Sequence, residues 1–306
     1  MYITEHEVRA CLTYEALIPA IRQGLIDYSA GLVQQPARMI LRAGNAEGDR
    51  NGWFAVMPVI AGDVMGVKTV TFFPGNADLG LHTHMAVIEL LSRATGNPLA
   101  VMDGRLITEM RTAAVSAVAL DALTATEEQG PRSLGILGSG VQARSHIQAL
   151  RMVRPALNDI RIWSRNPANA ESLAGEVGAR AVSIEEASGA DVVLTATASP
   201  QPVLQGRWLS PHALVLAVGA VGSHLRELDD QAMLGAWLVA ESRDSVEREA
   251  GDVVLSGAKV QAEIGDLLAP PAASAVPFGS RIVFKSVGMA IEDLVAARLV
   301  WQAHTA

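Results

Sequence analysis

The stretch LGILGSGVQA, from Leu134 to Ala143, decides the fold of this chain. A short apolar run leads into the pattern G-x-G-x-x-A, and a helix-forming segment follows it. In such a turn Gly138 permits the tight bend, Gly140 lets the backbone approach a pyrophosphate, and Ala143 lets the helix pack closely on the strand. The pattern therefore predicts a βα turn that binds a dinucleotide. The alternative is an ordinary βα turn of a doubly wound sheet, without a ligand.

Short apolar runs alternate with helical patterns on both sides of this turn. The runs carry apolar residues on both faces, which is typical of parallel strands covered by helices. They occupy residues 133–137, 160–164, 191–196, 214–219 and 237–241. The middle of the chain is therefore predicted to be an α/β domain with a parallel sheet.

The two ends of the chain have a different pattern. Thr4 and Glu7 have the spacing of a capping box, so the first segment is expected to be helical. Strands are expected at residues 64–73, 86–91 and 99–102, and a helix at about 108–124. These elements predict an α+β first third with antiparallel pairing. A last helix, at 286–303, falls outside the alternating pattern and is a candidate to cross back to the first domain.

Length and composition limit the class of protein. A chain of 306 residues is long enough for about two domains. With 24 basic and 32 acidic residues the net charge is −8, which argues against a general nucleic-acid binder. The mean hydropathy is +0.25, but the longest uncharged stretch, 208–225, contains Pro211, Gly219 and two histidines, which a bilayer core tolerates poorly. A single cysteine, Cys11, and a polar first segment predict a soluble, cytoplasmic protein without a signal peptide.

The end of the second predicted strand bears on the choice of dinucleotide. An Asp or Glu at this point would bind the adenosine ribose of NAD. The sequence instead has Ser164 and Arg165, and an arginine can pair with a 2′-phosphate. This favours NADP(H), with NAD(H) possible. The alternative is an exposed arginine with no ligand.

Lys68 stands in a strand-like run in which it is the one charge after Asp63. Strand alternation places it on the same face as Val64, Gly66 and Val70. A lysine on an apolar face is costly to bury unless it is paired, and burial lowers its pKa towards the range of a useful acid or base. The alternative is an edge-strand lysine that faces water.

Arg111 and Thr112 are expected in the first turn of the helix that begins near residue 108. An arginine beside free backbone N–H groups forms an anion site. The alternative is a surface arginine at a helix start. Arg38 is a candidate for a second clamp on a carboxylate.

Two histidines, His82 and His84, lie at strand spacing. A zinc site takes three or four protein ligands, and no third ligand follows at a suitable spacing. The sequence therefore predicts hydrogen-bonded structural histidines and no metal site.

Eight motifs in order along nearly the whole chain carry a family resemblance. They are Gly66-Val67-Lys68, Gly80-Leu81-His82-Thr83-His84, Asp103-Gly104, Met110-Arg111-Thr112-Ala113, Gly138-Ser139-Gly140-Val141, Arg226-Glu227-Leu228-Asp229, Glu249-Ala250-Gly251-Asp252 and the run from Phe284 to Asp293. This combination resembles the ornithine cyclodeaminase/μ-crystallin family. The resemblance implies a Rossmann domain, 119–286, inserted in a discontinuous α+β domain, 1–118 plus 287–306, that binds substrate and forms a homodimer.

The same resemblance implies roles for single residues. Arg38 and Arg111 would hold the carboxylate of a small-molecule substrate. Lys68, with His82 or water, would be the catalytic group beside the reacting nitrogen or carbonyl. The implied cofactor-binding positions are Thr83, Thr112, Gly138, Ser139, Gly140, Val141, Gln142, Ser164, Arg165, Thr197, Gly219, Ser286 and Val287.

Two departures from the family pattern bear on the reaction. Cyclodeaminases and the related alanine dehydrogenases carry an Asp after the Gly-Ala or Gly-Gly turn, where this chain has Val221 or its neighbours. Cyclodeaminases also carry a Glu two residues before Met-Pro, where this chain has Ala55. Without these acids a deaminating cycle is hard to run, because protons must move among amines.

The resemblance therefore favours the μ-crystallin-like branch, which reduces cyclic ketimines. The expected activity is NAD(P)H-dependent reduction of a cyclic imino acid, Δ1-pyrroline-2-carboxylate or Δ1-piperideine-2-carboxylate. Three alternatives stay open at this point: ornithine cyclodeaminase, a dehydrogenase of a simple amino acid, and a non-catalytic NADPH-binding protein.

Overall fold

The computed structural model describes residues 1–43, 52–124, 130–270, 277 and 279–306. The chain divides into two compact units, which we describe separately. The first unit is Met1–Arg111 with Met289–Ala306, and the second is Thr112–Gly288. The sequence predicts a substrate-binding domain at 1–118 with 287–306 and a dinucleotide-binding domain at 119–286. These limits and functions stay a prediction.

After the short strand β1 (Tyr2–Ile3), the first unit has two helices where the sequence predicted one helical segment. The capping box at Thr4 is confirmed, since its backbone N–H donates to Glu7 Oε2 at 2.8 Å. Helix α1 (Glu5–Cys11) ends at Leu12, and α2 (Tyr14–Ser29) follows directly. The buried residues of α2 include Leu17, Ile21 and Leu25.

A six-stranded sheet makes up most of the first unit. Its strands are β1 (Tyr2–Ile3), β2 (Met39–Ala43), β3 (Gly52–Ala61), β4 (Val64–Phe72), β5 (His84–Ser92) and β6 (Pro98–Asp103), in the order β1-β6-β5-β4-β3-β2. All neighbours from β2 to β6 are antiparallel, as predicted, and β1 pairs with β6 in parallel. A 3-10 helix, η1 (Pro74–Leu79), connects β4 to β5.

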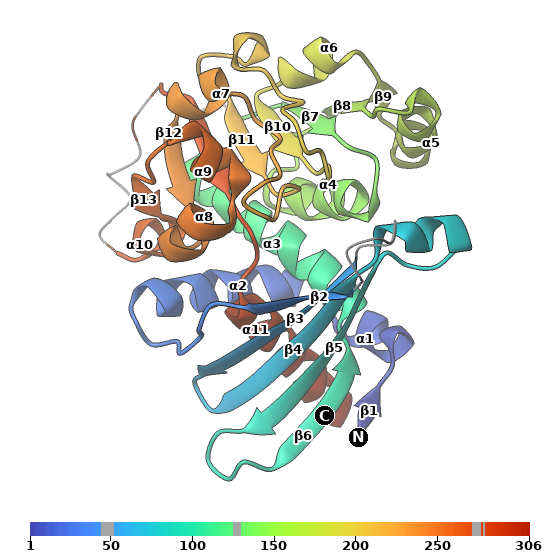
Figure 1. Cartoon of the computed structure of the whole chain (residues 1–306), viewed down its shortest axis with the longest axis vertical. Coiled ribbons are helices and arrows are strands. Elements are labelled where there is room, and N and C mark those ends of the chain that lie inside the picture. Colours follow the sequence, from blue (N-terminus) through green and yellow to red (C-terminus); the bar gives the residue numbers. More distant parts are fainter. Residues whose placement is uncertain (44–51, 125–129, 271–276, 278) are drawn as a thin grey trace. The chain divides into compact units, whose positions relative to one another are not determined.

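The last helix of the chain covers one face of this sheet. Helix α11 (Ala290–Thr305) packs on α2, β3 and β4 (Figure 1). It begins later than the predicted 286–303, because residues 286–289 are not helical: Gly288 has φ +83° and Met289 is the extended N-cap. Gly66 of β4 makes close packing possible on two sides: a Cβ there would lie 2.6 Å from the carbonyl oxygen of Glu89 in β5 and 3.0 Å from Leu294 Cδ1 of α11.

The second unit is built on an eight-stranded sheet in which every pairing is parallel. Its strands are β7 (Ser133–Leu137), β8 (Asp159–Trp163), β9 (Arg180–Ala181), β10 (Val192–Thr195), β11 (Leu214–Ala217), β12 (Trp237–Ala240), β13 (Ala262–Glu263) and β14 (Ile282–Lys285). The order is β13-β12-β14-β11-β10-β7-β8-β9. The five strands predicted from the sequence are all present, whereas β9, β13 and β14 were not predicted.

Helices connect these strands. They are α4 (Val141–Val153), α5 (Pro167–Val177), α6 (Ile184–Ser188), η2 (Gly206–Trp208), α7 (Asp230–Leu234), α8 (Arg243–Glu249), α9 (Gly251–Ser256) and α10 (Ile264–Leu268). Every residue of β7, β10, β11 and β14 is buried, so both faces of the central strands are covered. This doubly wound α/β arrangement is the predicted fold class.

Helix α3 (Arg105–Leu123) contains the limit between the two units. It begins at Arg105 and not near Thr108, so Arg111 lies beyond the first turn. Across the described residues, no helix is both long enough and apolar enough to cross a membrane.

Gly66→Ala is expected to lower the free energy of unfolding by about 1–3 kcal/mol, because the added methyl overpacks the contacts of β4 with β5 and α11. Urea unfolding followed by circular dichroism measures the change. Gly175→Ala is the matched control: a Cβ there meets nothing within 4 Å, and alanine is favoured over glycine in a helix such as α5 by about 1 kcal/mol. Equal stability of Gly66→Ala and the wild type would contradict the close packing.

Candidate active site

Lys68 lies in the interior of the sheet of the first unit. Strand β4 pairs with both neighbours, and Lys68 stands between Met57 of β3 and Ile88 of β5. Only 3% of the residue is exposed. The edge-strand alternative is therefore wrong, because an edge strand has a free side that exposes its residues to water.

Two acidic side chains from the first turn of α11 face Lys68 and Arg111. Lys68 Nζ lies 2.5 Å from Asp293 Oδ2. Arg111 donates from Nε to Asp293 Oδ1 at 3.1 Å and from Nη1 to Glu292 Oε2 at 2.6 Å. All four residues are buried. Two cations are thus held by two anions away from water, where ion pairs are far stronger than on the surface.

Burial and charge set the protonation of this cluster. Burial lowers the pKa of Lys68 to about 8, Asp293 opposes this shift, and the charges of Arg111 and Arg38 add to it. Burial by itself raises the pKa of Asp293, but Lys68 and Arg111 outweigh it and leave that pKa lowered. Lys68 can therefore release and take up a proton near neutral pH.

The two arginines predicted to bind a carboxylate have different surroundings. Arg111 lies in the second turn of α3, so its predicted place in the first helical turn is wrong. It is buried and paired with Glu292 and Asp293, so the surface-arginine alternative is also wrong. Arg38 precedes β2 and is half-buried. Its charge contributes to the lowered pKa of Lys68.

The two histidines have different surroundings, and His84 is the more buried of them. Burial lowers the pKa of His84 to about 4, and the charges of Lys68 and Arg111 contribute. His84 is therefore neutral at pH 7. His82 is exposed, and its carbonyl oxygen accepts a hydrogen bond from Asn76 Nδ2 at 3.0 Å. Thr83 is half-buried, and its carbonyl oxygen accepts from the Phe73 N–H at 2.8 Å.

Sequence reasoning missed Glu292 and Asp293 as site residues. A signal was present: two adjacent acids open a helix whose next residues, Leu294 to Ala297, are apolar. Acids are common in the first turn of a helix because they face its positive end. The local pattern is therefore explained without a site. It does not indicate that both side chains are buried and neutralise cations from β4 and α3.

The glycine-rich turn of the second unit fits a dinucleotide pyrophosphate. Gly138 has φ +128°, and a Cβ there would lie 2.6 Å from the Ala196 carbonyl oxygen. At Gly140, the N-cap of α4, a Cβ would meet nothing within 4 Å, and no side chain caps the helix. Val141 is half exposed and Gln142 half-buried in the first turn of α4. The turn thus leaves open space at backbone N–H groups that bind phosphate in such folds.

The neighbouring loop after β8 is joined to this turn. Ser139 Oγ donates to Ser164 Oγ at 2.9 Å. Arg165 follows and is exposed to solvent, so its guanidinium can reach a ligand.

The remaining predicted cofactor positions of the second unit follow the ends of other strands. Thr197 lies after β10, Gly219 after β11, and Ser286 and Val287 after β14. The carboxyl ends of parallel strands share one edge of a sheet, which is where doubly wound folds bind nucleotides. Thr112 is half-buried in α3.

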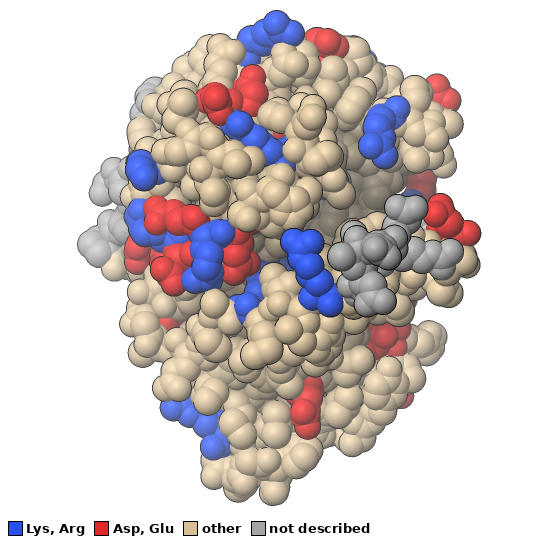
Figure 2. Space-filling model, viewed as in Figure 1, with Lys and Arg blue, Asp and Glu red and all other residues tan. Residues whose placement is uncertain are grey.

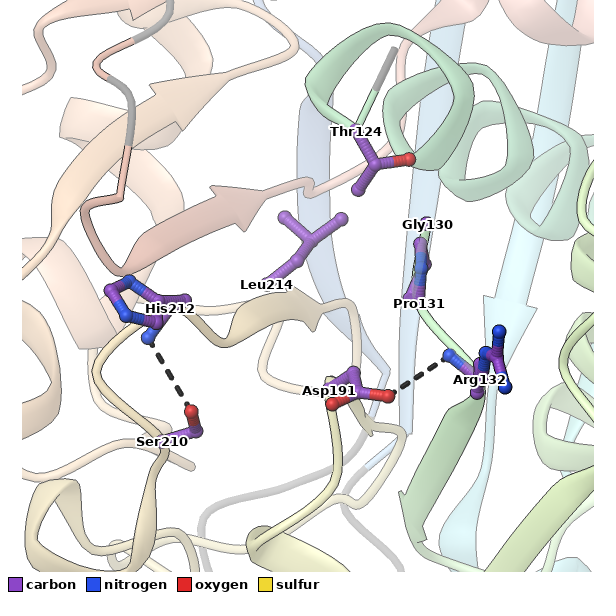
Figure 3. Close-up of a pocket in the computed structure, with 8 residues that line it drawn as sticks. All are labelled: Thr124, Gly130, Pro131, Arg132, Asp191, Ser210, His212 and Leu214. Atoms are coloured by element: carbon purple, nitrogen blue, oxygen red, sulfur yellow. Dashed lines mark hydrogen bonds between the residues drawn. The ribbon is translucent and has the colours of Figure 1, made fainter. Parts of the chain in front are cut away.

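A recess of about 320 Å³ lies at the opposite, amino-terminal edge of this sheet (Figure 3). Asp191 there accepts the Arg132 N–H at 2.9 Å, which ties together the starts of β10 and β7. The recess is lined by Thr124, Gly130, Pro131, Arg132, Asp191, Ser210, His212 and Leu214. Its position excludes it as the dinucleotide site, which belongs to the other edge.

Most of the face shown in Figure 2 is uncharged, and some of its acidic and basic side chains lie intermingled in one group at the left. Within the described ranges, no three His, Cys, Asp or Glu side chains are arranged to hold a metal ion.

Known proteins resemble this chain over its whole length. A sequence profile of the ornithine cyclodeaminase/mu-crystallin family matches residues 1–306. The chain is 38% identical over 310 residues to the ketimine reductase mu-crystallin of Mus musculus, covering 98% of this chain and 96% of the mouse protein. It is 32% identical over 306 residues to the Delta(1)-pyrroline-2-carboxylate/Delta(1)-piperideine-2-carboxylate reductase of Azospirillum brasilense, covering 95% and 92%.

Two solved structures have a similar fold. One is the Delta(1)-pyrroline-2-carboxylate reductase of Thermococcus litoralis in complex with NADH and L-proline, with a TM-score of 0.91 and 29% identity over 100% of this chain and 97% of that one. The other is an archaeal alanine dehydrogenase dimer with bound NAD, with a TM-score of 0.91 and 27% identity over 100% and 96%.

Asp293→Asn is expected to lower the pKa of Lys68 below its wild-type value of about 8, because the partner that favours the ammonium form is neutralised. The chain contains three lysines, Lys68, Lys259 and Lys285. Labelling with ε-13C lysine therefore gives three NMR signals to titrate, and Lys68→Met assigns one of them. Glu292→Gln, which removes the acid paired with Arg111, is the control and should move the midpoint less. An unchanged midpoint in Asp293→Asn would show that the pair does not set this pKa.

Proposed function

The chain belongs to the ornithine cyclodeaminase/mu-crystallin family, and from this premise we propose that it reduces a cyclic imino acid to the cyclic amino acid with NAD(P)H. The substrate class is Δ1-pyrroline-2-carboxylate or Δ1-piperideine-2-carboxylate. The observation that carries the proposal is Lys68, a buried lysine whose pKa of about 8 lets it deliver a proton at neutral pH.

Reduction of an imine adds a hydride to carbon and a proton to nitrogen, which breaks the C=N π bond and leaves a secondary amine. The nicotinamide, when bound, supplies the hydride. Lys68 supplies the proton or keeps it on the imine nitrogen, and solvent reprotonates the lysine afterwards. Arg38 and Arg111 bind the substrate carboxylate, and the ion pairs to Glu292 and Asp293 fix the orientation of Arg111. His82 is a further substrate contact in this proposal.

The two units divide these tasks in our proposal. The first unit binds the substrate, with Thr83 as a contact to the cofactor. The second unit binds the dinucleotide through the Gly138–Gly140 turn, with further contacts from the other predicted positions of that unit. The proposed set is Thr112, Ser139, Val141, Gln142, Ser164, Arg165, Thr197, Gly219, Ser286 and Val287.

The cofactor we propose is NADP(H), with NAD(H) as the alternative. No Asp or Glu follows β8 at the place that binds the adenosine ribose of NAD. Arg165 is exposed there and suits a 2′-phosphate. The Thermococcus relative was solved with NADH. A preference for NADP(H) would therefore distinguish this chain from that relative.

Ornithine cyclodeamination is the weaker candidate for chemical reasons. Ala55 is fully buried and faces the same side of the sheet as Lys68, since it pairs with Val70. A cyclodeaminase has a carboxylate at that position, and another where this chain has Val221. An imine reductase needs neither, because the protonated C=N bond is already an electrophile.

We also propose that the protein is a homodimer. The sheet face opposite Lys68 and α11 is apolar and exposed: Met39 is 62% exposed, Leu41 54%, Met85 44% and Val87 41%. An apolar face of this kind marks a protein contact. A second copy is the proposed partner, because the similar archaeal alanine dehydrogenase is a dimer.

Lys68→Met is expected to reduce kcat/KM for the imine by about 100-fold or more, the usual contribution of a general acid. In the wild type the rate should fall as the pH rises through about 8, because the ammonium form of Lys68 is lost. The assay follows NADPH and NADH oxidation at 340 nm with five- and six-membered cyclic imino acids. Lys259→Met, at an exposed position, is the control.

The same assay separates the alternatives. Ammonia released from L-ornithine without added cofactor would make the chain a cyclodeaminase. NADPH quenching of tryptophan fluorescence without turnover of any imine would make it a binding protein. Near-wild-type turnover in Lys68→Met would remove Lys68 from the mechanism.

Arg165→Ala is expected to weaken NADPH binding by about tenfold and NADH binding little, because it removes one charge-assisted contact to the 2′-phosphate. Fluorescence titration measures both dissociation constants. Arg151→Ala, an exposed arginine on α4, is the control. Equal effects of Arg165→Ala on the two cofactors would refute the 2′-phosphate role.

A further inference from the structure

Glu227 is a fully buried acid of the second unit, and it contacts two loops at the cofactor edge of the sheet. Its carboxylate accepts five hydrogen bonds. Oε1 accepts from the Thr197 N–H at 2.6 Å and from Thr197 Oγ1 at 2.7 Å. Oε2 accepts from Thr195 Oγ1 at 2.9 Å, the Gly219 N–H at 2.8 Å and the Ala220 N–H at 3.0 Å.

These donors belong to neighbouring strands. Thr195 ends β10 and Thr197 follows it, while Gly219 and Ala220 follow β11. Strands β10 and β11 pair in parallel, so both loops leave the sheet at the same edge. One carboxylate thus fixes the two loops to each other.

The loops are so close that one of them requires glycine. A Cβ at Gly219 would lie 2.1 Å from the Thr197 carbonyl oxygen and 2.5 Å from Glu227 Oε1. The glycine is therefore needed for the contact that Glu227 makes.

A second buried acid holds Glu227 in place. Asp252 Oδ1 accepts the backbone N–H groups of Glu227 at 2.7 Å and of Leu228 at 2.9 Å. Lys285 Nζ, at the end of β14, lies 3.0 Å from Asp252 Oδ2, and both side chains are fully buried. The cation offsets the cost of burying two acids. Burial raises the pKa of Glu227, and the charge of Lys285 and the donors of Thr197 oppose that shift.

The topology tells which half of a dinucleotide these loops meet. The strand order reverses between β7 and β10, and a dinucleotide binds across that point. The turn after β7 and the loop after β8 serve the adenosine half, because the adenosine ribose is read at the end of the second strand. The loops after β10 and β11 therefore face the nicotinamide half.

We propose that Glu227 is a positioning residue that holds the loops after β10 and β11 in the form that binds the nicotinamide half of the cofactor. The inference rests on the proposed function only in requiring that a nicotinamide dinucleotide binds. It predicts that disturbing Glu227 weakens binding of the nicotinamide half of the dinucleotide and leaves binding of the adenosine half unchanged. A purely structural role would weaken both halves alike.

Glu227→Gln tests this assignment, because it keeps the shape but turns an amide N–H₂ group toward N–H donors. The probes are NADPH and NADH, titrated by quenching of tryptophan fluorescence, and the fragments 2′,5′-ADP and ADP, titrated by calorimetry. We expect the dissociation constant of the dinucleotide to rise at least tenfold and that of its fragment to change less than twofold. Val192→Ala, a buried β10 residue that makes no side-chain hydrogen bond, controls for lost stability and should change both constants equally or not at all.

Thr195 provides a second test if Glu227→Gln fails to fold. Thr195→Val removes one donor to Glu227, and Thr195→Ser keeps it. We expect Thr195→Val to bind the dinucleotide at least threefold more weakly, with the fragment unchanged, and Thr195→Ser to match the wild type within twofold.

The outcomes separate the inference from the function. A wild type that binds neither NADPH nor NADH overturns the proposed function and the inference with it. A wild type that binds, with Glu227→Gln or Thr195→Val equal to it, overturns the inference alone. Equal weakening of the dinucleotide and the fragment also overturns it.

Discussion

The first unit depends on the ion pair between Lys68 and Asp293. A lysine in the middle of an apolar sheet face is strongly unfavourable without a partner, because it leaves water for a medium of low dielectric. The partner comes from α11, at the other end of the chain, and lies 2.5 Å away. The charge of Lys68 in the N-terminal sheet is thus neutralised by Asp293 when the C-terminal helix packs on that sheet. This contact joins two distant pieces of chain in one unit.

The same pair shapes the proposed chemistry. Full burial would lower the pKa of a lysine by several units, and a nearby carboxylate raises it again. The balance leaves Lys68 at about 8, close to the pH at which a proton donor works best. Arg111 shares the carboxylate of Asp293 and is held by Glu292 as well, so the proposed substrate clamp and the proposed proton donor are positioned by one turn of α11.

The second unit uses a different solution for buried charge. Glu227 accepts hydrogen bonds from hydroxyl and backbone N–H groups, and the charge of Lys285, which is paired with Asp252, also favours its ionised form. Backbone donors have fixed directions, so the acid fixes loops as well as charge. Both units place buried acids beside the residues proposed to bind ligands. That use of charge is compatible with a chain of which only 18% is charged.

The sequence by itself determined the features that depend on local pattern. The glycine turn at Gly138–Gly140, the five alternating strands and the antiparallel β5–β6 hairpin follow from periodicity and turn chemistry, which act over a few residues. The capping box at Thr4 is of the same kind. Lys68 was singled out because strand alternation puts it on an apolar face, though that pattern left an edge strand open.

Only the tertiary structure decided what joins residues far apart in the chain. Strand β14 lies between β11 and β12 in the sheet. Its four residues form a short apolar run that does not by itself indicate this position. Arg111 was expected at a helix start, but α3 begins earlier. The Arg111 side chain instead pairs with Glu292 and Asp293. Asp293 and Glu227 lie in motifs of the family resemblance, but their local pattern did not mark either as a buried acid that holds other groups in place. Their importance comes from the donors that folding brings to them, and those donors are set by packing across the sheet rather than by neighbours in sequence.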